Sequence, residues 1–178
     1  MLSLKVRGAL RLSAALALTL GLAACFRPLY GPTASGAPLT DVLASIDVDD
    51  VAVPPTYERF SQYLRSELVF DLNGSGVPAP KRYKLVLSFS PRIETPIVDT
   101  QTGRAQSATL VGDLRYTLTS LDGKQTLASG KLQGSASYDR NAQRFATVRA
   151  ARDAEIRLAK SLSDQLRTQI AVAVSNKA

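Results

Sequence analysis

The chain of 178 residues contains no histidine, and it has only one cysteine. The absence of histidine removes the usual general base near neutral pH, the serine–histidine and cysteine–histidine catalytic relays, and histidine metal sites. No glycine-rich phosphate-binding loop stands between a strand pattern and a helix pattern. The adjacent carboxylates of Asp49 and Asp50 would point to opposite faces of a strand and could not converge. We therefore expect a protein that is not an enzyme and that holds no metal or cofactor.

The sequence also lacks an apolar run long enough to cross a membrane. Residues 12–24 carry no charge, but a helix of that length would be roughly 20 Å long, against a hydrocarbon core of about 30 Å. Lys5, Arg7 and Arg11 precede this run as a basic leader. The layout is typical of a secretory signal peptide, so we expect residues 1–24 to be removed.

The signal-peptide pattern ends in Leu22-Ala23-Ala24-Cys25, which resembles the bacterial lipobox of leucine, two small residues and cysteine. The thiolate of such a cysteine takes up a diacylglyceryl group. Several acyl chains, palmitate among them, make a stable anchor where one chain would be marginal. We predict that Cys25 is lipidated and holds the protein on a membrane facing the periplasm, and that it forms no disulfide within the chain.

Composition changes after the predicted cleavage site. Loss of the three basic leader residues leaves +4 of the formal net charge of +7, and acidic and basic residues are interspersed, so no nucleic-acid partner is expected. The stretch that follows Cys25 is rich in proline, glycine and serine. We predict a lipidated cysteine and flexible linker over residues 25–44, a single domain over 45–172, and a tail over 173–178.

Two patterns begin the predicted domain. The first is a strand whose alternation slips near Asp49-Asp50, which indicates a β-bulge, and Pro54-Pro55 ends it. Its apolar residues are Ile46, Val48, Val51 and Val53. The second is a helix with Thr56 as its N-cap and Asn73-Gly74 as its stop. Its apolar residues recur at helical spacing: Tyr57, Phe60, Leu64, Leu68 and Leu72.

Three further strands follow. The first alternates at Tyr83, Leu85, Leu87 and Phe89, and a long polar loop or a broken hairpin is expected over residues 91–105. The second places one apolar face at Leu110, Leu114, Tyr116 and Leu118. Asp122-Gly123 then indicates a two-residue hairpin. The third has small inward residues that would let a helix approach closely, at Ala128, Gly130, Gly134 and Ala136, with Leu132 and Tyr138 among them.

The last predicted element is a long helix of about 28 residues with one apolar stripe. The stripe consists of Phe145, Val148, Ile156, Ala159, Leu162, Leu166 and Ile170. The order is therefore β-α-β-β-β-α, which predicts an α+β domain with two helices packed on one face of a four-stranded, mainly antiparallel sheet.

Two stretches resemble the lipopolysaccharide-assembly lipoprotein family LptE in its alphaproteobacterial form. Residues 25–31, CFRPLYG, are similar to the family's C-G-F-R-P-L-Y-G opening, although the glycine after the cysteine is missing. Residues 137–155 resemble the family's last strand, turn and C-terminal helix. The order of elements derived above is also the order of that family.

The resemblance implies an outer-membrane lipoprotein on the periplasmic side. Such a protein assists the assembly of the LptD β-barrel, plugs its lumen and helps to deliver lipopolysaccharide to the outer leaflet. Phe26 stands where many lipoproteins retained in the inner membrane have aspartate, which by the same resemblance indicates the outer membrane. A barrel lumen is polar. The predicted outward face of the sheet would suit it, with Thr109, Asp113, Arg115, Thr117, Lys131, Gln133 and Ser135.

Lipopolysaccharide carries phosphates, which arginine and lysine bind best. The candidate ligand-binding residues are Arg92, Arg104, Arg115 and Lys124, and each is also interpretable as an ordinary surface charge. The chain could instead be an auxiliary lipoprotein of a phospholipid-transport system. A periplasmic hydrolase is a third alternative, and it would need a cleft with two carboxylates at a suitable separation.

Overall fold

The computed structural model describes residues 36–74, 76, 79–95, 101, 103, 105–140 and 142–177. The chain divides into two compact units, Met1–Gly31 and Pro32–Ala178, and the described residues all belong to the second. The predicted signal peptide, Cys25 and the FRPLYG motif therefore lie outside the described residues.

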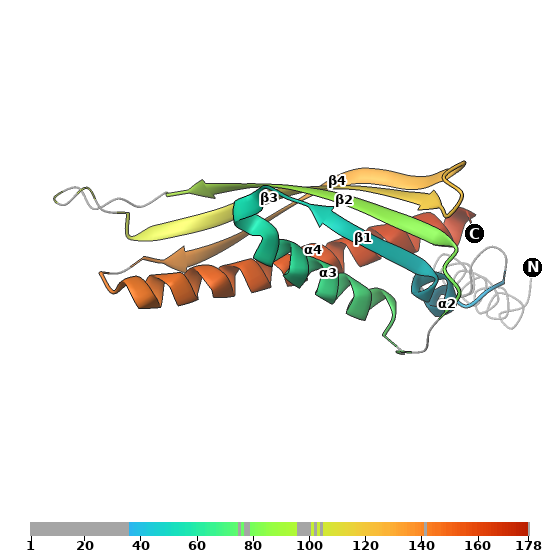
Figure 1. Ribbon diagram of the computed structural model, residues 1–178, viewed down its shortest axis with the longest axis horizontal. Coiled ribbons are helices and arrows are strands. Elements are labelled where there is room, and N and C mark those ends of the chain that lie inside the picture. Colours follow the sequence, from blue (N-terminus) through green and yellow to red (C-terminus); the bar gives the residue numbers. More distant parts are fainter. Residues whose placement is uncertain are drawn as a thin grey trace, which may run out of the picture. The chain divides into compact units, whose positions relative to one another are not determined.

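The second unit is a four-stranded sheet with its long helices on one side (Figure 1). In chain order the elements are α2 (Leu39–Ala44), β1 (Ile46–Ala52), η1 (Pro55–Tyr57), α3 (Glu58–Leu72), β2 (Tyr83–Glu94), β3 (Ser107–Ser120), β4 (Thr126–Asp139) and α4 (Arg144–Lys177). The strands lie side by side in the order β1-β2-β3-β4. β1 is parallel to β2 and the other pairs are antiparallel. The predicted fold class is confirmed, and so is the bulge in β1, where the register shifts between Val48 and Val51.

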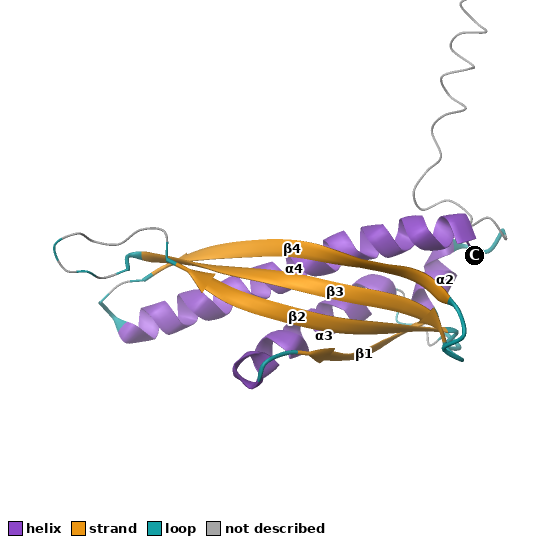
Figure 2. Ribbon diagram, turned by 90° about the horizontal axis from the view of Figure 1, so that it is seen from above, coloured by secondary structure: helices purple, strands orange, loops and turns teal. Residues whose placement is uncertain are grey.

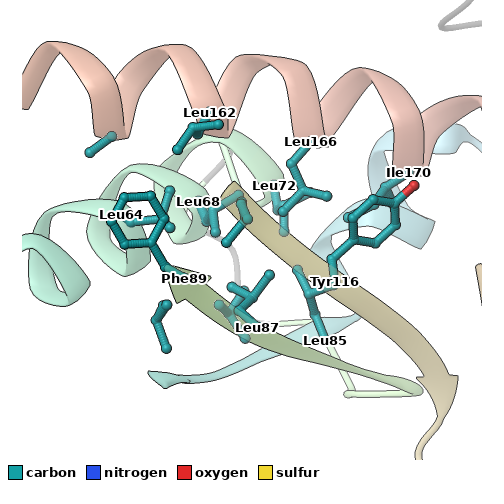
Figure 3. Close-up of a cluster of buried hydrophobic side chains, with 14 of the residues drawn as sticks. Leu64, Leu68, Leu72, Leu85, Leu87, Phe89, Tyr116, Leu162, Leu166 and Ile170 are labelled. Carbon is teal, nitrogen blue, oxygen red and sulfur yellow. The ribbon is translucent and has the colours of Figure 1, made fainter. Parts of the chain in front are cut away.

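The core lies between the sheet and the two long helices, α3 and α4 (Figure 3). The inward side chains of β2 and β3 alternate as predicted, because successive residues of a strand point to opposite faces. At its centre the ring of Phe60 on α3 stacks on the ring of Phe89 on β2, with 4.1 Å between the ring centroids. The leucines of α3 and α4 that surround this pair are fully buried.

Two glycines allow the close contacts in this core. A Cβ at Gly134 would lie 2.7 Å from Leu158 Cδ1, so glycine at this position lets α4 approach β4 closely, as predicted. A Cβ at Gly112 would lie 2.1 Å from Phe89 Cε2, so the Phe89 ring occupies the space above the β3 backbone. Both positions are places where any side chain would displace a packed neighbour.

The helix α2 lies within the segment predicted as linker, which is a correction. Its residues Leu39 and Leu43 are buried in the core, so this part of the chain belongs to the domain. The ammonium group of Lys81 donates to the carbonyl oxygens of Ala44 and Ile46 at 3.0 and 2.9 Å, and it thereby fixes the corner between α2 and β1.

The start of α3 also differs from the prediction. The N-cap is Tyr57, which makes no capping hydrogen bond through its side chain, and the predicted cap Thr56 lies inside the preceding 3-10 turn. Pro55 causes the difference, because a proline suits the first turn of a helix and starts η1 before α3. The end of α3 is as predicted, since Leu72 is its last residue and Asn73 its C-cap.

β2 continues to Glu94, through residues that were predicted to form a loop. Proline lacks the backbone N–H that a central strand needs, but it is tolerated at the edge of a sheet. β1 ends at Ala52, opposite Ser88, so Pro91 lies where β2 has become an edge strand. Of the two alternatives predicted for residues 91–105, the loop is therefore wrong for residues 91–94, and the antiparallel pairing of β2 with β3 there agrees with the hairpin.

The connection between β3 and β4 is longer than the predicted two-residue turn. Ser120 N–H donates to the Gln125 carbonyl oxygen at 2.8 Å, and Gly123 N–H donates to the Ser120 carbonyl oxygen at 2.9 Å. The Asp122 carboxylate accepts hydrogen bonds from the Ser120 hydroxyl and the Lys124 backbone N–H. These local bonds stabilise the wider turn.

The predicted stripe of α4 is confirmed only in its second half. Ala159, Leu162, Leu166 and Ile170 are fully buried, whereas Phe145 is 73% exposed, Val148 53% and Ile156 39%. Phe145 and Val148 belong to the first turns of α4, which extend beyond the start of α3 (Figure 1). At its other end α4 continues to Lys177 with Val174 buried, so the predicted tail is helical over most of its length.

Candidate functional site

The outer face of the sheet is its open side. Figure 2 looks onto this face, and within the described part of the chain no helix passes over it. Arg115 lies opposite Ser88 of β2 and Lys131 of β4, and Arg92 lies opposite Val111. Alternation along the strands places all these side chains on the outer face.

An ion-pair network connects the charged residues of this face. The Asp113 carboxylate lies between two cations, 3.5 Å from Arg92 Nη1 and 3.2 Å from Lys131 Nζ. Arg92 Nε also donates to Glu94 at 2.9 Å. Arg115 is exposed and forms no ion pair within the described residues. Arg92 and Lys131 thus balance the charges of Asp113 and Glu94, and Arg115 adds a local positive excess.

A polar hollow of about 450 Å³ adjoins this network at the β4 edge of the sheet. The side chains that line it include Arg92, Gln133 and Gln165. It is lined further by Thr109, Ser135 and Ser161. The lining offers hydrogen-bond donors and acceptors for a polar ligand.

The four predicted ligand-binding residues do not form one cluster. Arg92 and Arg115 share the outer face, four residues apart in the β2–β3 register. Lys124 is exposed in the β3–β4 turn, at the opposite end of the sheet from Arg92, with its Nζ 3.9 Å from Asp122. Arg104 lies outside the described residues.

We call the end of the sheet that contains residues 91–94, 107–112 and 134–139 the distal end. It carries features that the sequence interpretation missed. The segment 140–152 contains four arginines and no acidic residue, and its first helical residues expose Phe145 and Val148. Arg149 lies over the ring of Phe145, 5.7 Å from its centroid, and Arg152 lies over Tyr63 at 5.9 Å. This run of one charge sign was the signal in the sequence that could have indicated the site.

The arrangement does not indicate catalysis. Among the described residues, no group of three acidic or thiol side chains is placed to hold a metal ion. None of the described helices is both long enough and apolar enough to pass through a bilayer. What the surface offers is binding chemistry: an open polar face, unpaired guanidinium groups, and exposed apolar side chains at the distal end.

Comparison with known proteins identifies the family. The chain matches solved structures of a lipoprotein from Caulobacter crescentus, with a TM-score of 0.61, 22% identity, and coverage of 78% of this chain and 97% of that one. It also matches a minor lipoprotein from Acinetobacter baumannii, with a TM-score of 0.54, 15% identity, and coverage of 72% and 92%. At these identities the matches show a shared fold.

No curated protein matches the sequence. The sequence model of the lipopolysaccharide-assembly family LptE, however, matches residues 43–170, which is most of the chain and nearly all of the described domain. Lipopolysaccharide assembly is a non-enzymatic role in the cell envelope, which agrees with the expectation that the protein is not an enzyme. The chain therefore belongs to the LptE family of lipopolysaccharide-assembly lipoproteins.

Proposed function

We propose that this protein is an outer-membrane lipoprotein, anchored at the periplasmic face through Cys25, that assists the assembly of an LptD-type β-barrel and plugs its lumen. In that position it helps to deliver lipopolysaccharide to the outer leaflet. The observation that carries the proposal is the open outer face of the sheet, which is polar and charged although it belongs to a layer whose other face is buried.

This face suits the interior of a barrel for a physical reason. A large apolar patch would not be stable against a water-filled lumen, whereas side chains such as Asp113, Arg115 and Lys131 keep their hydrogen bonds there. Standard protein interfaces have a polar rim and many bridging waters, so a polar face can still bind specifically.

Arg92 and Arg115 are the residues that we propose for the phosphates of lipopolysaccharide. Both are on the open face, and a phosphate that bound Arg115 would meet the positive excess left by the Asp113 network. Arg104 and Lys124 remain proposed contacts that await test. Lys124 is the less well supported of these two contacts, because it lies at the opposite end of the sheet from Arg92.

Depletion of the protein in its native host tests the assembly role. We expect the barrel to accumulate in a misassembled form, and the cell surface to lose lipopolysaccharide. Complementation with the wild-type chain restores both, and complementation with Cys25→Ala tests the anchor. Normal barrel assembly and normal surface lipopolysaccharide after depletion would contradict the proposal.

Binding of lipopolysaccharide tests the phosphate contacts separately. The double variant Arg92→Asp/Arg115→Asp should bind it less tightly, by roughly a hundredfold if each of the two charged hydrogen bonds contributes about 1.5 kcal/mol. Arg82→Asp is the matched control, since Arg82 is an exposed arginine that precedes β2 at the other end of the sheet. Equal affinities for the two variants would exclude Arg92 and Arg115 as phosphate ligands.

A further inference from the structure

A second, apolar cavity lies at the distal end, on the helix side of the sheet. This cleft has a volume of about 360 Å³, within the range of roughly 300–1,000 Å³ that is usual for small-molecule sites. Ile93, Leu110 and Tyr138 come from three neighbouring strands, and Ala151 comes from α4. The remaining lining residues are Thr56, Tyr57 and Glu155.

The cleft exists because the sheet is longer than the elements that cover it. β1 ends opposite Ser88 and α3 begins only at Glu58, so the inward face of β2 beyond Phe89 has no helix packed on it from that side. α4 packs on β4 and β3 instead. Ile93 points inward like Phe89 but is 53% exposed, whereas Phe89 is buried.

The walls of the cleft are electrically neutral. The Glu155 carboxylate accepts two hydrogen bonds from Arg59, both at 2.9 Å, so its charge is paired. Burial raises the pKa of the Tyr57 phenol, which therefore stays uncharged near neutral pH. The cleft thus suits an apolar group. Because the one carboxylate in its lining is paired with Arg59, the lining does not repel an anion that binds at the mouth.

Helix geometry extends the cleft toward two arginines. Residues three, four and seven apart lie on one face of an α-helix, so Ala151, Val148 and Arg144 follow one another along α4. Val148 is 53% exposed and continues the apolar surface outward. Arg144 begins the helix, and Arg140 follows the β4 strand that supplies Tyr138.

The charges around the mouth favour an anion. Arg140 and Arg144 form no ion pair within the described part of the chain. Two acidic groups nearby are already neutralised, Glu155 by Arg59 and Asp153 by Arg157, the latter pair at 2.7 Å. Because successive residues of β4 point to opposite faces of the sheet, Asp139 lies on the outer face and points away from the cleft.

We propose that this cleft binds an acyl chain of lipopolysaccharide, with a phosphate of the same molecule at Arg140 and Arg144. The apolar cleft would bind the hydrocarbon part of such an anionic amphiphile, and the two unpaired guanidinium groups would bind its charged group. The assignment to lipopolysaccharide, in preference to a phospholipid, rests on the proposed function. The acyl-chain cleft on the helix side is separate from the phosphate contacts proposed for the outer face.

Photo-cross-linking in living cells tests the proposal with the full lipoprotein. A photoreactive amino acid at position 93 or position 148 should form an adduct with lipopolysaccharide. The matched controls are Phe70 and Val172, which are also exposed apolar residues, at 72% and 44%, but do not line the cleft. We expect roughly tenfold more adduct at position 93, which lines the cleft, and at position 148, which lies beside it on α4, than at the two controls, as the burial of a few methylene groups would give.

A photoreactive residue at position 115 on the outer face separates the two proposals. Adducts at 115 but not at 93 or 148 would overturn the cleft assignment and leave the proposed function in place. Absence of lipopolysaccharide adducts at all three positions would contradict binding by either surface. Adducts with phospholipid at 93 and 148 would overturn the assignment of the ligand.

Filling the cleft gives an independent test. Ala151→Trp should lower the adduct formed at position 93 roughly tenfold, whereas the control Ala150→Trp, one residue away and outside the lining, should leave it unchanged. Val148→Asp changes an exposed side chain that folding does not require, and it should have the same effect. An undiminished adduct in a folded Val148→Asp variant would contradict the proposal.

Discussion

The two ends of the sheet differ in what covers their inward face. At the end near α2, the inward residues of β2 and β3 are packed under both α3 and α4, and side chains such as Leu85 and Leu118 are completely buried. At the distal end the same strands continue with one helix over them, and Ile93 is more than half exposed. A single pair of strands therefore supplies stability at one end and an accessible surface at the other.

Phe89 and Ile93 offer the sharpest test of this difference, because they point inward from the same strand. Phe89→Ala should lower the free energy of unfolding by about 3–5 kcal/mol, since it removes a buried ring that stacks on Phe60. Ile93→Ala should cost less than about 1 kcal/mol, as an exposed side chain loses little burial. Chemical unfolding of the purified variants measures both. Similar losses for the two would contradict the contrast between the ends.

Gly112, opposite Pro91, marks the boundary between the two ends. Gly112→Ala places a methyl group against the Phe89 ring, which cannot move because Phe60 stacks on it. We expect a loss of about 1–3 kcal/mol in unfolding free energy. The control is Gly74→Ala, whose Cβ would meet only a carbonyl oxygen at an ordinary 3.7 Å. A neutral Gly112→Ala would show that the core near the boundary is loosely packed.

The bridge between Arg59 and Glu155 holds α3 to α4 beside the cleft. Its two partners are unequally exposed, 53% for the arginine side chain and 13% for the glutamate. Arg59→Met should cost about 1–2 kcal/mol because it leaves the less exposed carboxylate without its partner. Glu155→Gln should cost less than about 1 kcal/mol, since water can solvate the arginine. Thermal unfolding of both variants measures which one loses more stability. A larger loss for Glu155→Gln would contradict the expectation that the less exposed carboxylate depends more on the pair than the more exposed arginine does.

The smallest expected effect is a dependence of stability on pH at the end near α2. Hydrogen bonds from Lys84 lower the pKa of Asp49, and those from the Ser120 hydroxyl and the Lys124 backbone lower the pKa of Asp122, below the ordinary value of 3.8. A carboxyl whose pKa is lower in the folded state stabilises the fold above its unfolded pKa and loses that contribution as the pH falls through the folded pKa. Stability should thus decline slightly below about pH 4. Asp122→Asn should reduce that decline, and an unchanged pH profile would contradict the assignment.

Local patterns were sufficient to predict most of the fold. The alternation in β2, β3 and β4 and the small residues at Gly134 and Ala136 indicated both the sheet and the helix approach. The predictions that were wrong concern positions whose structure depends on where a neighbouring strand or helix begins or ends. Pro91 could be placed in a strand only once β1 was known to stop at Ala52, and Phe145 could be recognised as exposed only once the start of α3 was known.

Only part of the candidate site could be predicted, because a local pattern places a side chain on one face of the sheet but does not show what lies beside it. Strand alternation was enough to place Arg115 on the outer face. Lys124 was grouped with the other candidates, although successive turns of an antiparallel sheet lie at opposite ends, which separates Lys124 from Arg92. Arg140 and Arg144 were not singled out, because surface arginines are common and a local pattern does not distinguish them. Their interest depends on the cleft beside them, which exists only in three dimensions.

The proposed function depends most on the barrel partner. A tagged full-length protein, purified from its native host in a mild detergent, tests that partner directly. We expect a large outer-membrane β-barrel to be recovered with it in a one-to-one ratio, together with lipopolysaccharide. Recovery of an inner-membrane transporter complex and no barrel would contradict it, and would instead support the role in phospholipid transport.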